Sequence, residues 1–126
     1  MFKESKKLRV LGYGRVSTRG QFLKGTSAKE QKASVKKECK KEGFKLIDFL
    51  IDDGVSGKTV LDRPAIKKVK KLAEADKFDR LMFTKFDRVG RSFKELQKFW
   101  ELIEDDLGKQ IYCIDYPCDW RNEFCL

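Results

Sequence analysis

The chain alternates short apolar runs with longer amphipathic stretches. Four apolar runs have the length and composition of buried strands, and they cover residues 8–17, 44–51, 80–86 and 110–115. In the first run, a period of two places Arg15 and Ser17 on the same face, close to its carboxyl end. The sequence therefore predicts four strands, the first of which ends in a polar pair.

Helices are expected between these strands. Residues 27–30 (Ser-Ala-Lys-Glu) form a capping box that predicts a helix start, and Gly43 is suited to end that helix. Pro64 predicts the first turn of a second helix, because its missing N–H costs little there. A second capping box at residues 92–95 opens a third, strongly amphipathic helix. Its apolar face consists of Phe93, Leu96, Phe99, Trp100, Ile103 and Leu107.

Strands that alternate with helices predict an α/β domain with three layers. The central sheet is expected to be mainly parallel, with four to five strands flanked by helices. In such sheets, functional groups gather at the carboxyl ends of the strands. Ser17 ends the first predicted strand, Asp53 follows the second, and residues 87–91 follow the third. We expect these three segments to converge on one site.

Composition and charge narrow the function. The 126 residues suit a single domain, and 40% of them are hydrophobic, which is enough for a real core. The formal net charge is +9, and residues 1–45 carry 14 basic against 4 acidic side chains. This asymmetry favours a polyanionic partner, most simply nucleic acid, over the alternative of a solvated lysine-rich helix.

The four cysteines and the absence of histidine exclude several classes. Cys39, Cys113, Cys118 and Cys125 lack CxxC spacing and histidine partners, so we read them as ordinary reduced thiols and expect no structural metal. The acidic runs at residues 52–53 and 104–106 raise the alternative of a metal-dependent nuclease, which we disfavour because residues 104–106 lie at a predicted helix end and are typical of solvated surface. Neither a secretory signal nor an apolar run long enough to span a membrane is present.

The candidate chemistry lies in a serine surrounded by arginines. The chain has no histidine, so the usual activator of a serine nucleophile is missing. Guanidinium groups, in contrast, bind phosphate oxygens in bidentate geometry, and they are abundant near Ser17 in the predicted fold. They belong to Arg15, Arg63, Arg88 and Arg91, and Asp87 accompanies them. This combination points to chemistry on a phosphodiester.

Several motifs in the same order resemble the catalytic domain of serine site-specific recombinases, the resolvase/invertase family. Residues 13–17 (YGRVS) match the family's Y-x-R-[VI]-S segment, and residues 53–57 (DGVSG) its D-x-x-S-G loop. Residues 62–64 (DRP) and 85–92 (KFDRVGRS) match two further signatures, so the resemblance runs from about Leu8 to Pro117. Gln31 lies 14 residues beyond Ser17, a gap similar to that of large serine integrases and serine transposases.

The resemblance implies a role for each candidate residue. Ser17 is expected to attack a DNA phosphate, giving a 5′-phosphoserine link and a free 3′-hydroxyl, with no nucleotide cofactor. The four arginines are expected to stabilise charge on the phosphate oxygens. Asp87 is expected to orient an arginine, and Gln31 to contact phosphate or Ser17. Three residues, Asp53, Asp79 and Lys85, match supporting positions near the site.

The base that deprotonates Ser17 is left open by the sequence. Arginine is a poor base because it is effectively always protonated. The options are Asp87, Asp53, or a serine pKa lowered by the surrounding positive charge. Two other function classes also stay open, a catalytically silent module with the same fold and a flavodoxin-like nucleotide-binding protein, although no GxGxxG or Walker A loop is present.

The resemblance also sets expectations for partners and organisation. Residues 1–126 are read as one catalytic domain, without the long oligomerisation helix and the DNA-binding domain of family members. DNA is the expected partner, with a homodimer or homotetramer in the full-length protein. The 126-residue chain is expected to be a monomer or weak dimer that binds DNA weakly and does not recombine alone. A bacterial cytoplasmic protein of a mobile element, without membrane contact, is the expected setting.

Overall fold

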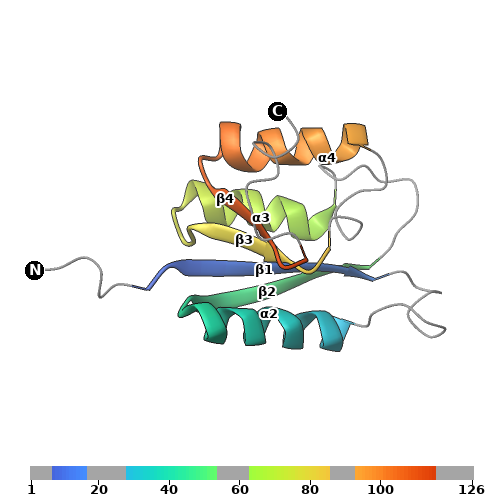
Figure 1. Cartoon of the computed structure of the whole chain (residues 1–126). Coiled ribbons are helices and arrows are strands. Elements are labelled where there is room, and N and C mark those ends of the chain that lie inside the picture. The colour runs from blue at the N-terminus through green and yellow to red at the C-terminus, as the bar shows by residue number, and fades with distance from the viewer. Residues whose placement is uncertain (1–6, 17–27, 54–62, 86–92, 116–126) are drawn as a thin grey trace, which may run out of the picture.

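The computed structural model describes residues 7–16, 28–53, 63–85 and 93–115. Within these ranges a parallel sheet of four strands has the order β2-β1-β3-β4. The strands are β1 (Arg9–Val16), β2 (Lys45–Asp53), β3 (Arg80–Phe83) and β4 (Gln110–Cys113). The helices are α2 (Ala28–Glu42), α3 (Pro64–Glu74), α4 (Phe93–Trp100) and the π-helical segment η4 (Glu101–Asp106). The predicted α/β class and the parallel sheet are confirmed (Figure 1).

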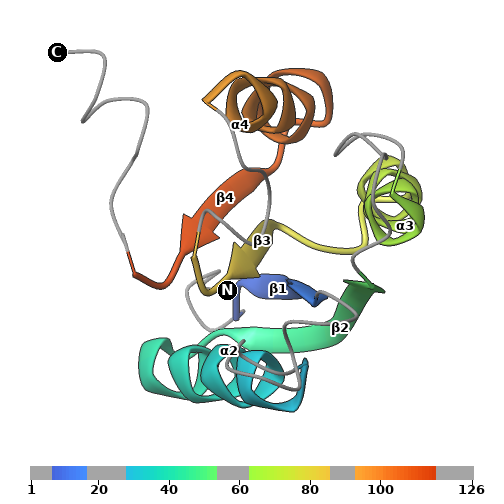
Figure 2. The ribbon, with the colours of Figure 1, turned by 90° about the vertical axis from the view of Figure 1, so that its right-hand side faces the viewer.

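Helices cover both faces of the sheet and enclose two apolar cores. Figure 2 shows α2 on one face and α3 with α4 on the other. The larger core joins Leu11 and Tyr13 of β1 to buried residues of α3 and η4, among them Ile66 and Ile103. The smaller core lies under α2, around Val35. β1 therefore alternates its side chains between two buried layers, which fixes the direction in which each of them points.

The predicted element boundaries agree with the structure at most ends. Gly43 ends α2 in a left-handed conformation with φ of 77°, as expected of a helix-terminating glycine. The third predicted helix differs in two ways. Its second half is the π-helical segment η4, in which the Leu107 N–H donates to the Leu102 carbonyl. Phe93, which we placed on the apolar face, is 64% exposed, so that prediction is wrong.

Paired cysteines, metal-binding clusters and membrane-spanning helices are absent from the described residues. Cys39 and Cys113 are buried free thiols, in line with the reading of ordinary reduced cysteines. Over the described ranges, no group of three or more potential ligands is arranged to hold a metal ion. Within the same ranges, no helix has the length and apolar character of a membrane span.

Candidate active site

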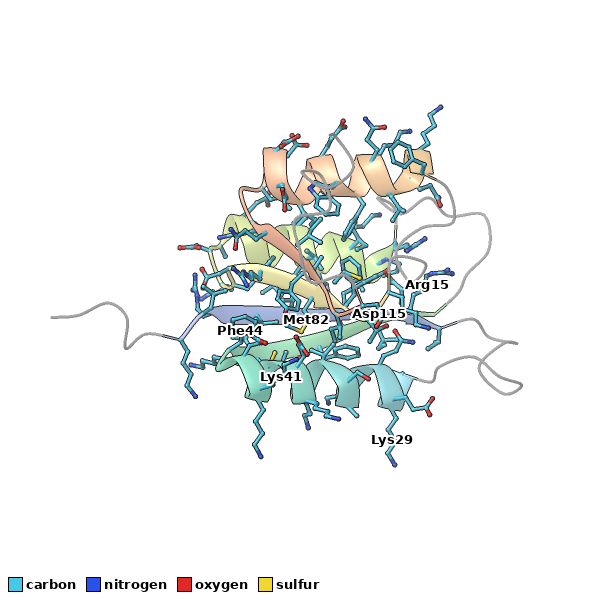
Figure 3. The ribbon with its side chains drawn as sticks, in the orientation of Figure 1. Arg15, Lys29, Lys41, Phe44, Met82 and Asp115 are labelled. Carbon is cyan, nitrogen blue, oxygen red and sulfur yellow. The ribbon has the colours of Figure 1, made fainter. Side chains whose placement is uncertain are left out.

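The carboxyl ends of β1 and β2 lie side by side and form the base of the candidate site. Arg15 is in register with Asp52, and Val16 with Asp53. Figure 3 shows Arg15 at this end of the sheet, with Asp115 at the same end and Phe44 at the opposite one. Ser17 follows Val16 directly and lies outside the described residues. In the sequence, the predicted nucleophile thus directly follows a strand whose last residues are placed by the sheet.

Gln31 of α2 binds the main chain of Arg15. Its side-chain Oε1 accepts a hydrogen bond from the Arg15 N–H at 3.2 Å, and its Nε2 donates to the Arg15 carbonyl at 3.1 Å. β3 pairs with β1 only as far as Gly12. The carboxamide therefore takes the place of a neighbouring strand at Arg15, because it presents one acceptor and one donor in the spacing of a peptide group. Gln31 is fully buried, so its position is fixed by packing.

Gly14 leaves the space that this amide occupies. A Cβ atom at Gly14 would lie 2.6 Å from Gln31 Oε1 and 2.8 Å from Ile51 Cδ1. Both distances are shorter than a van der Waals contact, so any larger residue would displace the amide or the strand beside it. The glycine of the Y-x-R-[VI]-S segment is thus explained by close packing around Arg15.

Arg63, Tyr13 and Asp52 form a second, buried hydrogen-bond network on the α3 side of the sheet. Arg63 Nη1 donates to the Tyr13 hydroxyl oxygen at 3.2 Å, and that hydroxyl donates to Asp52 Oδ2 at 2.9 Å. The other carboxylate oxygen, Oδ1, accepts the Ala65 N–H at 2.8 Å. Asp52 is 2% exposed, and Arg63 is also buried. The network therefore ties the ends of β1 and β2 to the start of α3.

Asp52 caps α3 from a distant part of the chain. Arg63 occupies the N-cap position without a side-chain capping bond, and Pro64 follows at the first helical position. The Asp52 carboxylate satisfies the Ala65 N–H and places negative charge at the amino end of the helix, where the helix dipole favours it. Burial, with the Asp52 charge beside it, raises the pKa of Tyr13 well above its usual range, so its hydroxyl stays protonated and donating.

Arg15 and Arg63 are brought to the same side of the sheet. Arg15 is two residues beyond Tyr13 on the same face of β1, which corresponds to about 7 Å along a strand. Because Arg63 contacts the Tyr13 hydroxyl, both guanidinium groups belong to the α3 side of the carboxyl edge. Two of the four predicted arginines are thus placed on the same side of the sheet, Arg15 two residues before Ser17 in the sequence and Arg63 through its contact with Tyr13. Arg88 and Arg91, with Asp87, lie outside the described residues.

The supporting residues divide into two groups. Asp53 ends β2 beside Val16, so its backbone is where the prediction requires it. Lys85 follows β3 at the same edge, and its Nζ lies 4.0 Å from Asp115 Oδ2 in an exposed ion pair. Both therefore remain candidates for a supporting role.

Asp79 does not belong to this edge, and its prediction as a residue near the site is corrected. It precedes β3 at the amino end of the sheet and binds Arg9 at the start of β1. Arg9 Nη2 donates to Asp79 Oδ1 at 2.8 Å, and Arg9 Nε to Oδ2 at 3.1 Å. Val16 is seven positions beyond Arg9 along β1, or about 23 Å. Asp79 is a structural partner of Arg9.

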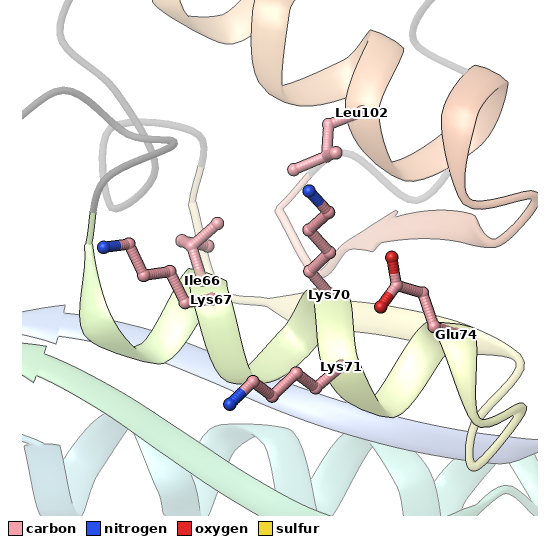
Figure 4. Close-up of a pocket in the computed structure, with 6 residues that line it drawn as sticks. All are labelled: Ile66, Lys67, Lys70, Lys71, Glu74 and Leu102. Carbon is pink, nitrogen blue, oxygen red and sulfur yellow. The ribbon is translucent and has the colours of Figure 1, made fainter.

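A groove of about 430 Å³ lies between α3 and η4 (Figure 4). The α3 wall carries three lysines and Glu74, whereas η4 contributes the apolar Leu102. The predicted site residues that the structure describes do not line it. Its lining consists of Ile66, Lys67, Lys70, Lys71, Glu74 and Leu102. The lining is therefore mainly basic, with Glu74 as its one acidic side chain.

Two residues of the site were missed by sequence reasoning. Tyr13 was noted only as part of a motif, and Asp52 only as part of a loop and an acidic run. The available signal was the period of two in both strands, which puts Tyr13 on the face of Arg15 and Asp52 at the end of its own run. Buried polar side chains at strand ends require partners, and here they find one another.

Comparison with known proteins places this geometry among resolvases. A family model described as "Resolvase, N terminal domain" matches residues 10–124. The solved N-terminal catalytic domain of TP901-1 integrase is 29% identical, with a TM-score of 0.73 over 85% of this chain and 78% of that one. No curated protein matches the chain.

Two further solved structures share the fold at lower identity. The C-terminal catalytic domain of ISC1926 TnpA, an IS607-like serine recombinase, is 24% identical, with a TM-score of 0.67 over 85% of this chain and 70% of that one. A resolvase family site-specific recombinase from Streptococcus pneumoniae is 21% identical, with a TM-score of 0.72 over 94% of this chain and 80% of that one.

Proposed function

The chain belongs to the resolvase N-terminal domain family, and from this premise we propose which of its residues cleave DNA. It is the catalytic domain of a DNA recombinase, an enzyme that breaks and rejoins DNA strands. We assign Ser17 as the nucleophile and Arg15 and Arg63 as phosphate-binding residues. The observation that supports this best is that Arg15 and Tyr13, the residue that Arg63 contacts, lie on the same face of β1, whose last residue directly precedes Ser17 in the sequence.

The proposed reaction exchanges one phosphoester for another. The Ser17 Oγ forms a bond to phosphorus while the bond to the 3′-oxygen breaks, and the 3′-oxygen takes up a proton. The family implies the resulting 5′-phosphoserine, and the reverse reaction with another 3′-hydroxyl rejoins the strand. Because the ester conserves the energy of the broken bond, neither step requires a nucleotide cofactor.

The arginines stabilise charge that gathers on the phosphate oxygens. Guanidinium groups held in place before the reaction do this best, because no reorganisation is needed as the charge develops. By analogy with other phosphoryl-transfer sites, loss of one such arginine is expected to slow cleavage by about 10³-fold. We propose that Arg88 and Arg91 complete the set, with Asp87 orienting one of them. The identity of the base stays open among Asp87, Asp53 and a serine with a lowered pKa.

Gln31 is proposed to act through Arg15. We expected it to contact phosphate or Ser17, but both polar atoms of its carboxamide face the Arg15 main chain. It holds the strand end from which the Arg15 side chain and Ser17 both extend. We therefore propose a positioning role for Gln31, and direct contact with phosphate stays a prediction.

We further propose that the protein belongs to the large serine integrase or transposase branch and is encoded by a mobile element. The gap of 14 residues from Ser17 to Gln31 supports this, as does the 29% identity to the TP901-1 integrase domain. We also propose that the full-length protein acts as a homodimer or homotetramer, since each recombination event must cut and exchange several strands.

Trapping the covalent intermediate tests the chemical assignment. The purified chain is incubated at low salt with a pool of nicked duplexes, on which cleavage releases a short product that cannot be rejoined. Mass spectrometry is expected to find a 5′-nucleotide on the peptide that contains Ser17, and none in Ser17→Ala. A nucleotide attached to another side chain would refute the assignment. If a full-length, DNA-binding version of the protein also forms no adduct, the silent module is favoured.

A further inference from the structure

The Asp52 carboxylate is the one acidic group of the described network at the strand ends, and nothing so far gives it a role in the reaction. It accepts the Tyr13 hydroxyl with one oxygen and the Ala65 N–H with the other. Resting on the proposed function of Arg63, we propose that Asp52 is a positioning residue for the reaction. It orients the Arg63 guanidinium toward the phosphate through the Tyr13 hydroxyl and the start of α3.

The direction of the hydrogen bonds supports this proposal. A carboxylate only accepts hydrogen bonds, so the Tyr13 proton must point at Asp52. The Tyr13 oxygen then presents its lone pairs toward Arg63 Nη1, which donates at 3.2 Å. Asp52 thereby determines that Tyr13 is an acceptor for Arg63 rather than a donor competing with it. The raised pKa of Tyr13 is consistent with a hydroxyl that keeps this proton.

The second contact of Asp52 fixes the backbone that carries Arg63. Ala65 is two residues beyond Arg63, and its N–H is one of those left without a helical partner at the start of α3. The carboxylate binds this N–H at 2.8 Å. One side chain therefore holds Arg63 at both ends, the guanidinium through Tyr13 and the main chain through Ala65. Each of the three network side chains is buried, so solvent does not substitute for a lost contact.

The chain offers a matched control for this arrangement. On the opposite face of the sheet, the Tyr112 hydroxyl donates to Glu38 Oε2 at 2.6 Å, and Glu38 is also buried. This second pair links β4 to the third turn of α2. Glu38→Gln and Tyr112→Phe therefore remove the same kind of hydrogen bond as Asp52→Asn and Tyr13→Phe, at a place that does not contact Arg63.

Asp52→Asn is the informative substitution because it preserves shape. An asparagine Oδ1 can still accept the Ala65 N–H, whereas its Nδ2 can only donate toward Tyr13. The Tyr13 oxygen then faces two donors, Arg63 Nη1 and the new amide nitrogen. The Tyr13 hydroxyl proton no longer has a carboxylate acceptor. We expect formation of the Ser17 adduct to slow by about 100-fold, the cost typical of a small misplacement of a reacting group. Tyr13→Phe serves as a second variant if the first is unstable.

A double-substitution test separates positioning from general stability. If Asp52 acts through Arg63, the double variant forms the Ser17 adduct at the same rate as Arg63→Ala alone. If Asp52→Asn causes an independent structural defect, the two reductions in rate multiply. Glu38→Gln and Tyr112→Phe are expected to leave the rate within about twofold, as is typical of variants distant from the chemistry. Equal slowing by the control variants, or a further loss in the double variant, would overturn the proposal.

A second readout does not depend on activity. The side-chain N–H signals of Arg63, assigned by their loss in Arg63→Lys, are expected to be protected from exchange with water in the wild-type chain. Asp52→Asn should lose this protection, and Glu38→Gln should keep it. Unchanged protection in Asp52→Asn would overturn the proposal. If the wild-type chain forms no Ser17 adduct, the proposed function fails, and the exchange data still decide whether Asp52 positions Arg63.

Discussion

Gly14→Ala is the substitution that most directly tests how the end of β1 is held. The new methyl group would lie 2.6 Å from Gln31 Oε1 and 2.8 Å from Ile51 Cδ1. Because Ile51 belongs to the paired strand β2, the Gln31 amide is the group more easily displaced. The substitution is therefore expected to break the two hydrogen bonds between Gln31 and the Arg15 main chain.

The expected magnitude follows from these two hydrogen bonds. Each neutral hydrogen bond contributes about 0.5–1.5 kcal/mol, so their joint loss costs about 1–3 kcal/mol. Alanine offsets about 0.5–1 kcal/mol of this, because glycine loses more conformational freedom on folding. Together these ranges lead us to expect that Gly14→Ala lowers the free energy of unfolding by about 0–2.5 kcal/mol, with a central value of about 1 kcal/mol.

A double-mutant cycle with Gln31→Ala provides the assay. Urea unfolding followed by tryptophan fluorescence measures both single variants and the double variant. Removing the Gln31 amide also removes its overlap with the new methyl group, so Gly14→Ala should cost about 1 kcal/mol less in the Gln31→Ala background. Gly12→Ala is the control, since the three atoms nearest to a Cβ atom there belong to the apolar side chains of Phe49 and Val35.

Two results would refute this reasoning. Additive effects of Gly14→Ala and Gln31→Ala would show that the methyl group and the amide do not compete for space. Coupling of the same size between Gly12→Ala and Gln31→Ala would show that Phe49, which lies beside both glycines, transmits a general repacking. If Ser17 adduct formation is slower in Gly14→Ala than in Gly12→Ala, the hydrogen bonds between Gln31 and the Arg15 main chain also contribute to the reaction.

Three further outcomes follow from the structure. Asp79→Asn should leave adduct formation unchanged and lower stability by about 1 kcal/mol near pH 7, allowing for the solvent screening of a 37% exposed carboxylate. Its partner Arg9 lowers the pKa of Asp79 to about 2, so this difference is present above pH 4 and vanishes as the pH falls toward 2; a difference that persists at pH 2, measured by urea unfolding, would contradict it. Burial raises the pKa of Cys39 to about 11, so peptide mapping after alkylation at pH 8 should find Cys39 unmodified unless urea is present; rapid labelling of the native chain would contradict this. The 126-residue chain should bind duplex DNA weakly, with an affinity that falls steeply with salt in fluorescence anisotropy; tight, sequence-specific binding would contradict this.

Local patterns in the sequence were sufficient to predict the three-layer arrangement of the fold. The period of two in β1 placed Arg15 and Ser17 on one face, and the structure confirms the alternation for the described residues through Leu11 and Tyr13. Gly43 was correctly expected to end α2. These features are decided by short-range periodicity and backbone conformation, so the sequence carries them directly.

Contacts between distant segments were not predictable in the same way. The partner of Gln31 is a main-chain group 16 residues away, and the Asp52 network joins positions 39 and 50 residues apart. The misplacement of Asp79 was avoidable. In a parallel sheet, a residue that precedes a strand lies at the edge opposite to residues that follow one, and Asp79 precedes β3. The rule that functional groups lie at the carboxyl ends of parallel strands, which predicted the site, therefore excludes Asp79 from it.

The two described arginines are held from opposite faces of the sheet by different means. Gln31 reaches the Arg15 main chain from the α2 side, beside the Cβ direction of Gly14. Asp52 reaches Arg63 from the α3 side, through Tyr13 and the start of the helix. One support is a neutral amide acting on backbone, and the other is a buried carboxylate acting on a side chain. The hydrogen bonds of the two supports described above involve different groups, so we expect Arg15 to keep its position when Arg63 is replaced, and Arg63 to keep its position when Arg15 is replaced.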